Sequence, residues 1–319
     1  MIIHLGRVSE DLSRELEKAF DRIGLLSQLS KVSKVFVKPN FTYPRHMPGI
    51  TTSPEFLEAV IRIAANHGAE IFVGESNGGY GSFRAADAFG GHRLREICND
   101  TKATAVNLSE QEAREYTGTV AGRKTTVVLP RFLVEEVDLT ISAPVLKVHV
   151  MTTVSLSVKN LWGCCPLDLR LLQHAQLDRK LKLIAELTKA RFAFIDATYG
   201  LDKHGPMDGE PRHLGKFIAA DDLYGVDWVT AQMMGFNPRS IQHLRMIPKA
   251  TRKEINEKTI EANADLSKID WGFSLGFNLI DTLSFASFHS DALARLVFDS
   301  RLTRPIYALF GRQPRRRLL

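Results

Sequence analysis

The stretch that most constrains the fold runs from Val137 to Pro166, where an apolar run passes into closely spaced polar residues. The run breaks at Pro144 and is followed by Lys147, His149, Ser157, Lys159 and Asn160. A strand that ends in a loop and leads into a short helical segment would gather these side chains at the edge of a sheet. Ligands of open α/β proteins bind at that edge. The sequence therefore predicts a functional site centred on this stretch.

The first half of the chain predicts the kind of sheet. Residues 34–38 (KVFVK) form an apolar run of strand length, and residues 69–73 form a second one. Between them, Ser53 and Pro54 are typical of a helix start, and apolar residues then recur at helical spacing. A strand, a helix and a strand in this order predict a right-handed parallel crossover. We therefore expect an α/β fold with a mainly parallel sheet flanked by helices.

The rest of the chain is expected to belong to the same single domain, residues 1–319. Short β-rich runs at 102–130, with a turn at Ala121-Gly122, predict a small antiparallel addition to the sheet. Residues 240–319 have a helical and loop-like pattern, and no linker precedes them. We expect them to form a helical C-terminal extension packed on the domain.

Composition and charge limit the partners. Hydrophobic residues make up 44% and charged residues 24%, the balance of an ordinary globular protein. The net charge is +6, but four positive charges lie in the tail, at Arg312, Arg315, Arg316 and Arg317. The body of the chain is only mildly basic, which argues against a nucleic-acid partner and suits a pocket for a small anionic molecule. The tail is expected to be solvated, with contact to an anionic membrane as the alternative.

Three cysteines, Cys98, Cys164 and Cys165, limit the redox chemistry. They lack C-x-x-C spacing, so we expect no intrinsic iron–sulfur cluster, and adjacent cysteines rarely form disulfides, which favours a cytoplasmic protein. No apolar window is long enough for a transmembrane segment, and the N-terminus does not resemble a signal peptide. A metal or organic cofactor is left open: His149 and His174 with a carboxylate would supply enough ligands, but their spacing matches no metal motif.

Three residues predict the chemistry. Lys147 and His149 lie two positions apart, so in an extended segment they face the same side. A lysine there stabilises an anion and a histidine moves a proton near neutral pH; in the alternative, Lys147 reaches the surface and His149 bonds a backbone carbonyl. Lys159 interrupts an apolar segment, and a buried ammonium group requires a partner. That partner is a bound anion or one of four carboxylates: Glu75, Asp196, Asp222 and Asp227.

Further polar residues stand at strand ends. Lys38 and Asn40 end the first strand, Glu75 ends the second and Asp196 ends a later one. Because the carboxyl ends of parallel strands face one crevice, we expect Lys38, Glu75, Lys147 and Asp196 to share it. Ser157 is expected to cap or pack, since no motif of a nucleophilic serine surrounds it.

Several motifs, in a fixed order, resemble those of the domain of unknown function 362 family. They are VKPNF at 37–41, TTSPEF at 51–56, GAEIFVGES at 68–76, KVH with SVKNLWG at 147–163, AFID at 193–196 and ADDLYGVDWVTAQMMG at 220–235. The resemblance adds His174, Asp222 and Asp227 to the expected site, although Asp222 could equally cap a helix. Many members carry a ferredoxin-like insert with four-cysteine motifs, which this chain lacks. The resemblance therefore implies an external electron donor or no redox chemistry.

Together these features predict a biosynthetic enzyme, an isomerase, lyase or reductase, acting on a small carboxylate or phosphate compound. His149 is the expected acid or base, and Lys147 and Lys159 are expected to stabilise negative charge. The expected substrate-binding residues are Lys38, Asn40, Glu75, Ser157, Asn160, His174, Asp196, Asp222 and Asp227. The alternatives are a non-catalytic small-anion binding protein and a partner subunit of an iron–sulfur protein. An external redox protein and a homo-oligomer are left open.

Overall fold

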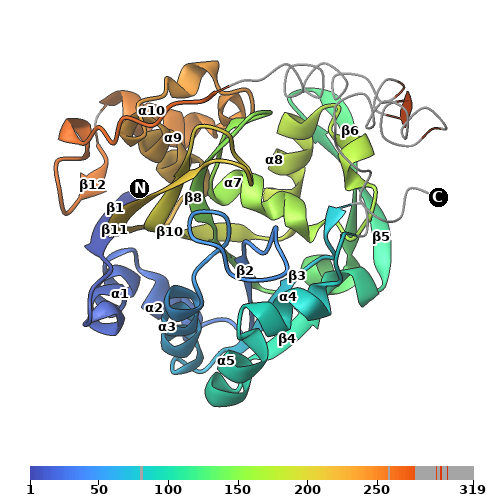
Figure 1. Cartoon of the computed structure of the whole chain (residues 1–319), viewed down its shortest axis with the longest axis horizontal. Coiled ribbons are helices and arrows are strands. Elements are labelled where there is room, and N and C mark those ends of the chain that lie inside the picture. Colours follow the sequence, from blue (N-terminus) through green and yellow to red (C-terminus); the bar gives the residue numbers. More distant parts are fainter. Residues whose placement is uncertain (80–81, 258, 277–291, 293–294, 297–299, 301–319) are drawn as a thin grey trace.

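The computed structural model describes residues 1–79, 82–257, 259–276, 292, 295–296 and 300, and its core is a ten-stranded mixed sheet (Figure 1). Eight strands follow one another in the order β12-β1-β11-β10-β7-β2-β3-β4, and β8 and β9 extend the sheet beside β10. The strands are β1 (Ile2–Arg7), β2 (Lys34–Pro39), β3 (Glu70–Glu75), β4 (Thr104–Asn107), β7 (Leu139–Ala143), β8 (Val145–His149), β9 (Thr153–Ser155), β10 (Ala190–Asp202), β11 (Glu210–Ala220) and β12 (Glu261–Ala262).

The centre of the sheet is parallel, which confirms the predicted α/β fold. Strands β4, β3, β2, β7 and β10 run in one direction, β11 is antiparallel to β10, and β1 is antiparallel to β11. The parallel part follows from the strand–helix–strand pattern, because only a crossover helix can join parallel neighbours at that spacing.

Helices cover both faces of the sheet (Figure 1). They are α1 (Leu12–Arg22), α2 (Leu25–Leu29), α3 (Pro54–Ala65), α4 (Ala85–Gly91), α5 (Leu94–Thr101), α6 (Arg131–Glu135), α7 (Ser157–Asn160), α8 (Leu177–Leu187), α9 (Leu223–Met233) and α10 (Lys249–Glu257). Helices α1, α3 and α5 pack on one face, and α7, α8 and α9 pack on the other. Side chains alternate between the two faces along a strand. In β2, Phe36 therefore packs on the side of α7, α8 and α9, whereas Val35 and Val37 pack on the side of α1, α3 and α5.

The predicted antiparallel element forms its own small sheet. Strands β5 (Ala113–Val120) and β6 (Arg123–Pro130) pair with each other around the predicted Ala121-Gly122 turn. Both turn residues have positive φ, 49° and 74°, as a tight hairpin of this kind requires. The first β-rich run behaves differently, because it becomes β4 and joins the main sheet in parallel with β3.

The expected C-terminal extension is described only in part. Helix α10 and short 3-10 turns follow residue 240, and β12 returns to pair with β1. The tail that begins at Arg312 lies outside the described residues. Within the described ranges, no helix combines the length and apolar character needed to cross a membrane.

Candidate functional site

The first buried charge is the ammonium group of Lys38, at the end of β2. Its Nζ lies 2.5 Å from Oε2 of Glu75, at the end of the adjacent parallel strand β3, and also donates to the Pro39 carbonyl at 2.7 Å. Glu75 also accepts from the backbone N–H groups of Phe41 and Ser76. The ammonium group and the carboxylate thus neutralise each other, and backbone groups supply further hydrogen bonds to both. A buried ion pair needs this arrangement.

The second buried ammonium group, on Lys147 of β8, is held by neutral oxygens. It donates to Asn40 Oδ1 at 3.0 Å, Thr42 Oγ1 at 3.2 Å and the Ile50 carbonyl at 2.8 Å. Its three hydrogens are therefore used, and the side chain, which is 1% exposed, does not reach the surface. Burial, followed by the charge of Lys159, lowers the pKa of Lys147 to about 7.

The third buried ammonium group, on Lys159 of α7, differs from both. No described residue gives it a hydrogen bond or a carboxylate within ion-pair distance, and its side chain keeps 9% exposure, against 0% for Lys38. Burial, followed by the positive charge of Arg170, lowers the pKa of Lys159 to about 8, and the charge of Lys38 acts in the same direction. This end of the sheet therefore holds a cation that the described part of the protein leaves unneutralised.

The four candidate carboxylates are engaged elsewhere. Both oxygens of Asp196 accept hydrogen bonds, from the backbone and hydroxyl of Ser53 and from those of Thr198, so this residue anchors the start of α3. Asp227 accepts from Ser157 N at 2.9 Å, Ser157 Oγ at 2.5 Å and Val158 N at 2.8 Å. It therefore holds the first turn of α7, the helix that carries Lys159, and the hydroxyl of Ser157 is used in this contact. Burial raises the pKa of Asp227 to about 7.

Asn40 and Asn160 connect the lysines. Asn160 Nδ2 donates to the Lys38 carbonyl at 2.7 Å, and Asn40 Nδ2 donates to Asn160 Oδ1 at 3.3 Å. Asn40 Oδ1 accepts from Lys147 and also from the hydroxyl of Thr42. The structure thus brings together Lys38, Asn40, Glu75, Lys147 and Asn160 in one hydrogen-bonded network, which contains the strand-end residues Lys38, Glu75 and Lys147 but not Asp196.

His149 lies beside these lysines as a neutral donor. Its Nδ1 accepts a hydrogen bond from the Met151 backbone N–H at 3.1 Å, so the neutral ring carries its proton on Nε2. Burial, with the charges of Lys159 and Lys147, keeps the pKa of His149 well below its ordinary value. His174 is buried near it, with its ring 5.5 Å from that of Trp162. In the described residues no cluster of three or more His, Cys, Asp or Glu side chains has the arrangement of a metal site.

Sequence reasoning missed His243, which lies in a 3-10 turn, η6 (His243–Met246), after α9. The side chain is 2% exposed, and burial, followed by the charge of Lys159, lowers the pKa of His243 to about 3. The only sequence signal is a histidine between apolar residues, in IQHLRMI, which is equally typical of a core histidine. Its proximity to Lys159 arises from tertiary packing.

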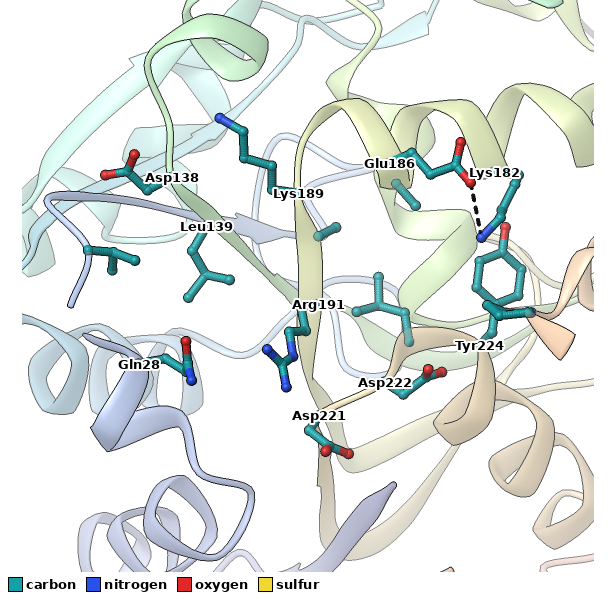
Figure 2. A pocket seen from close by; sticks show the side chains of 15 residues that line it. Gln28, Asp138, Leu139, Lys182, Glu186, Lys189, Arg191, Asp221, Asp222 and Tyr224 are labelled. Atoms are coloured by element: carbon teal, nitrogen blue, oxygen red, sulfur yellow. Dashed lines mark ion pairs between the residues drawn. The ribbon is translucent and has the colours of Figure 1, made fainter. Parts of the chain in front are cut away.

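Asp222 is the predicted site residue that the structure places apart from the lysines. It caps α9 by accepting from Gly225 N at 2.7 Å and also accepts from Thr251 Oγ1 at 2.8 Å. It lines a pocket of about 450 Å³ at the amino ends of β7 and β10, the opposite edge of the sheet. Figure 2 shows Asp222 there with Asp221 and Arg191. The helix-cap alternative is therefore what the structure shows for Asp222.

Comparison with known proteins gives two individual matches. Over 217 residues the chain is 26% identical to the thylakoid-associated protein sll1697 of Synechocystis sp., and the match covers 65% of each protein. The chain thus spans about 65% of that relative's length. A crystal structure of a Thermotoga maritima protein from a structural genomics consortium matches 66% of this chain and 54% of its own, with 14% identity and a TM-score of 0.35.

The match to a family covers the network itself. The model of the domain of unknown function 362 family (DUF362) matches residues 35–232, which include Lys38, Lys147, Lys159 and His149. This chain therefore belongs to the DUF362 family.

Proposed function

We propose that this protein is an enzyme that binds a small carboxylate or phosphate substrate at Lys159 and stabilises negative charge on it through His149. The observation that carries the proposal is the unneutralised ammonium group of Lys159, buried beside Arg170, Lys38 and a neutral imidazole. Like charges held together in a region of low dielectric repel strongly, and a bound anion relieves that repulsion. The same positive charges are therefore expected to bind an anion tightly.

The roles of the other residues follow from their hydrogen bonds. His149 presents its Nε2 hydrogen, because Nδ1 is occupied by the Met151 N–H. A fixed donor aimed at an oxygen that gains negative charge lowers the barrier of proton abstraction, elimination or reduction beside a carbonyl. Lys147 is fully hydrogen-bonded to neutral oxygens and acts through its charge. Lys38, Glu75, Asn40 and Asn160 fix the positions of these groups.

Thermal melting with a panel of small anions tests the proposal. We expect acetate or phosphate to raise the melting temperature of the parent protein, because a ligand that binds only the folded state stabilises it by about 2.7 kcal/mol at one hundred times its Kd. Lys159→Met keeps the apolar stem, removes the charge and is expected to abolish the shift. The matched control is Lys124→Met, which replaces an exposed lysine of β6. This variant should show the same anion-dependent rise in melting temperature as the parent protein. A parent protein indifferent to every anion contradicts the proposal.

A second measurement separates an enzyme from a protein that only binds anions. Carboxylates that raise the melting temperature are incubated with the parent protein in heavy water, with and without a reductant, and followed by NMR. An enzyme of the proposed kind exchanges or transforms the ligand, and His149→Phe, which lacks the Nε2 hydrogen, does so far more slowly. Anion binding with no change in any ligand supports the binding-protein alternative.

A further inference from the structure

His243 is buried, and the described part of the chain offers neither of its ring nitrogens a hydrogen-bond partner. Both Nδ1 and Nε2 are inaccessible and unpaired, and the side chain is 2% exposed. A buried polar group without a partner loses its hydrogen bonds to water and gains none in return, so such groups are rare in native proteins and call for an explanation. A bound ligand that supplies the partner is one explanation.

The position of His243 connects it with Lys159. The turn η6 packs on α8 and α9, and α7, which carries Lys159, packs on the same two helices. The charge of Lys159 lowers the pKa of His243, and a proton on His243 would in turn disfavour one on His149, so the three side chains lie close enough to interact electrostatically. Trp162, three positions after Lys159 along consecutive helical turns, has a buried and unpaired indole N–H. Residues three apart in such turns lie on the same side, so a further donor lies on that side.

We propose that His243 contacts the ligand bound at Lys159 and selects anions that carry a second oxygen beside the charged group. This inference rests on the proposed function and names the substrate class of the same site. A neutral imidazole has one N–H donor and one acceptor nitrogen, which a hydroxyl or oxo group next to a carboxylate can satisfy. A plain carboxylate leaves the imidazole unpaired. A site built to hydrogen-bond a hydroxyl rejects analogues that lack it, because its own polar groups then stay buried and unpaired.

Acetate and glycolate test this selectivity, because they have the same charge and differ by one hydroxyl group. Melting curves of the parent protein over a range of concentrations give an apparent Kd for each. We expect glycolate to bind about tenfold more tightly, the effect of one buried hydrogen bond. His243→Phe should bind acetate and glycolate with similar affinity. Without ligand, this variant should be as stable as the parent or more stable, because the phenyl ring has no nitrogen to leave unpaired.

His4 provides the matched control. It is 6% exposed on β1, its two ring nitrogens are also buried and unpaired, and the charges that act on it belong to α1 rather than to the lysine site. His4→Phe therefore makes the same chemical change away from the ligand. It should leave the preference for glycolate intact.

Each outcome supports or overturns the inference. Equal binding of acetate and glycolate by the parent overturns the selectivity while the proposed anion site stands. A preference that survives in His243→Phe overturns the role of His243. If that variant does not fold, His243→Leu is measured in the same way, and failure of both to fold assigns the residue to the core. A parent protein that responds to neither anion contradicts the proposed function, and the inference with it.

Discussion

Three buried lysines lie in one region, and what surrounds each ammonium group decides its role. Lys38 faces a carboxylate, Lys147 faces three neutral oxygens and Lys159 faces other cations. The sequence predicted that Lys147 and Lys159 would act alike on an anion. Their surroundings distinguish them, because the hydrogens of Lys147 are already used whereas those of Lys159 remain available for a ligand.

Methionine substitutions should separate these roles in stability measurements without added anions. Lys38→Met leaves the buried carboxylate of Glu75 without its charged partner and should lower the free energy of unfolding by about 3–5 kcal/mol. Lys159→Met removes a charge whose burial is unfavourable, since the pKa falls from 10.5 to about 8, and should leave that free energy unchanged or raise it by up to about 3 kcal/mol. Urea unfolding at pH 7 checks both. Strong destabilisation of Lys159→Met would indicate an internal ion pair.

At the scale of elements, the junction of α7 with the 3-10 turn η3 (Leu161–Cys164) fits against the ends of β2 and β3. The contact is close at Gly163, where an added Cβ would lie 2.4 Å from Glu75 Oε1 and 2.8 Å from Lys38 Nζ. The Gly163 carbonyl also accepts from Ser76 Oγ at 2.7 Å. Only a glycine lets this backbone approach the ion pair so closely, which links the position of the Lys159 helix to the strand ends.

Gly163→Ala should therefore displace the ion pair or the turn and destabilise the protein by about 1–3 kcal/mol, the usual effect of overpacking. Gly90→Ala in α4 is the control, because an added Cβ there has no atom within 4 Å. That change should be neutral or stabilise by about 1 kcal/mol, because alanine favours a helix. Chemical unfolding of both variants is the measurement, and equal effects would show that the contact at Gly163 is unimportant.

At the scale of the whole molecule, buried histidines make stability depend on pH. Burial is the main cause that lowers the pKa of His92 to about 4, that of His243 to about 3 and that of His149 well below its ordinary value. Below about pH 6.5 the unfolded chain binds protons that the folded protein does not, so stability falls as the pH falls. Asp227 opposes this, because its raised pKa lets the folded protein hold a proton between about pH 4 and 7 that the unfolded chain has released.

Burial also lowers the pKa of His4 and His46, so five imidazoles act against one carboxyl group and the net effect is a loss of stability below pH 6.5. Each imidazole contributes about 1.4 kcal/mol per pH unit. Urea unfolding between pH 5 and 8 should show this slope, and His243→Phe should reduce it by one imidazole's share on the acid side. A free energy of unfolding that does not change between pH 5 and 6.5 would mean that these side chains take up protons in the folded state.

The sequence alone determined the fold class and the place of two charged residues at neighbouring strand ends. Apolar runs, a helix start and a crossover spacing are local patterns, and they place Lys38 and Glu75 at the ends of neighbouring parallel strands. Lys147 and His149 are two positions apart, which predicts that they face the same side of a strand, and both lie in β8. The hairpin at Ala121-Gly122 followed from its turn residues, although its formation of a separate sheet did not.

Only the tertiary structure decided which charges are neutralised. All four candidate carboxylates were plausible partners for Lys159 from the sequence, yet Glu75 pairs with Lys38, Asp196 and Asp227 hold helix starts, and Asp222 lies at the opposite edge. His243 reaches the site from a turn after α9, through packing on helices distant in sequence. Ion pairs and hydrogen bonds act over a few ångströms, so they depend on how separate elements pack, which the pattern of a single segment does not encode.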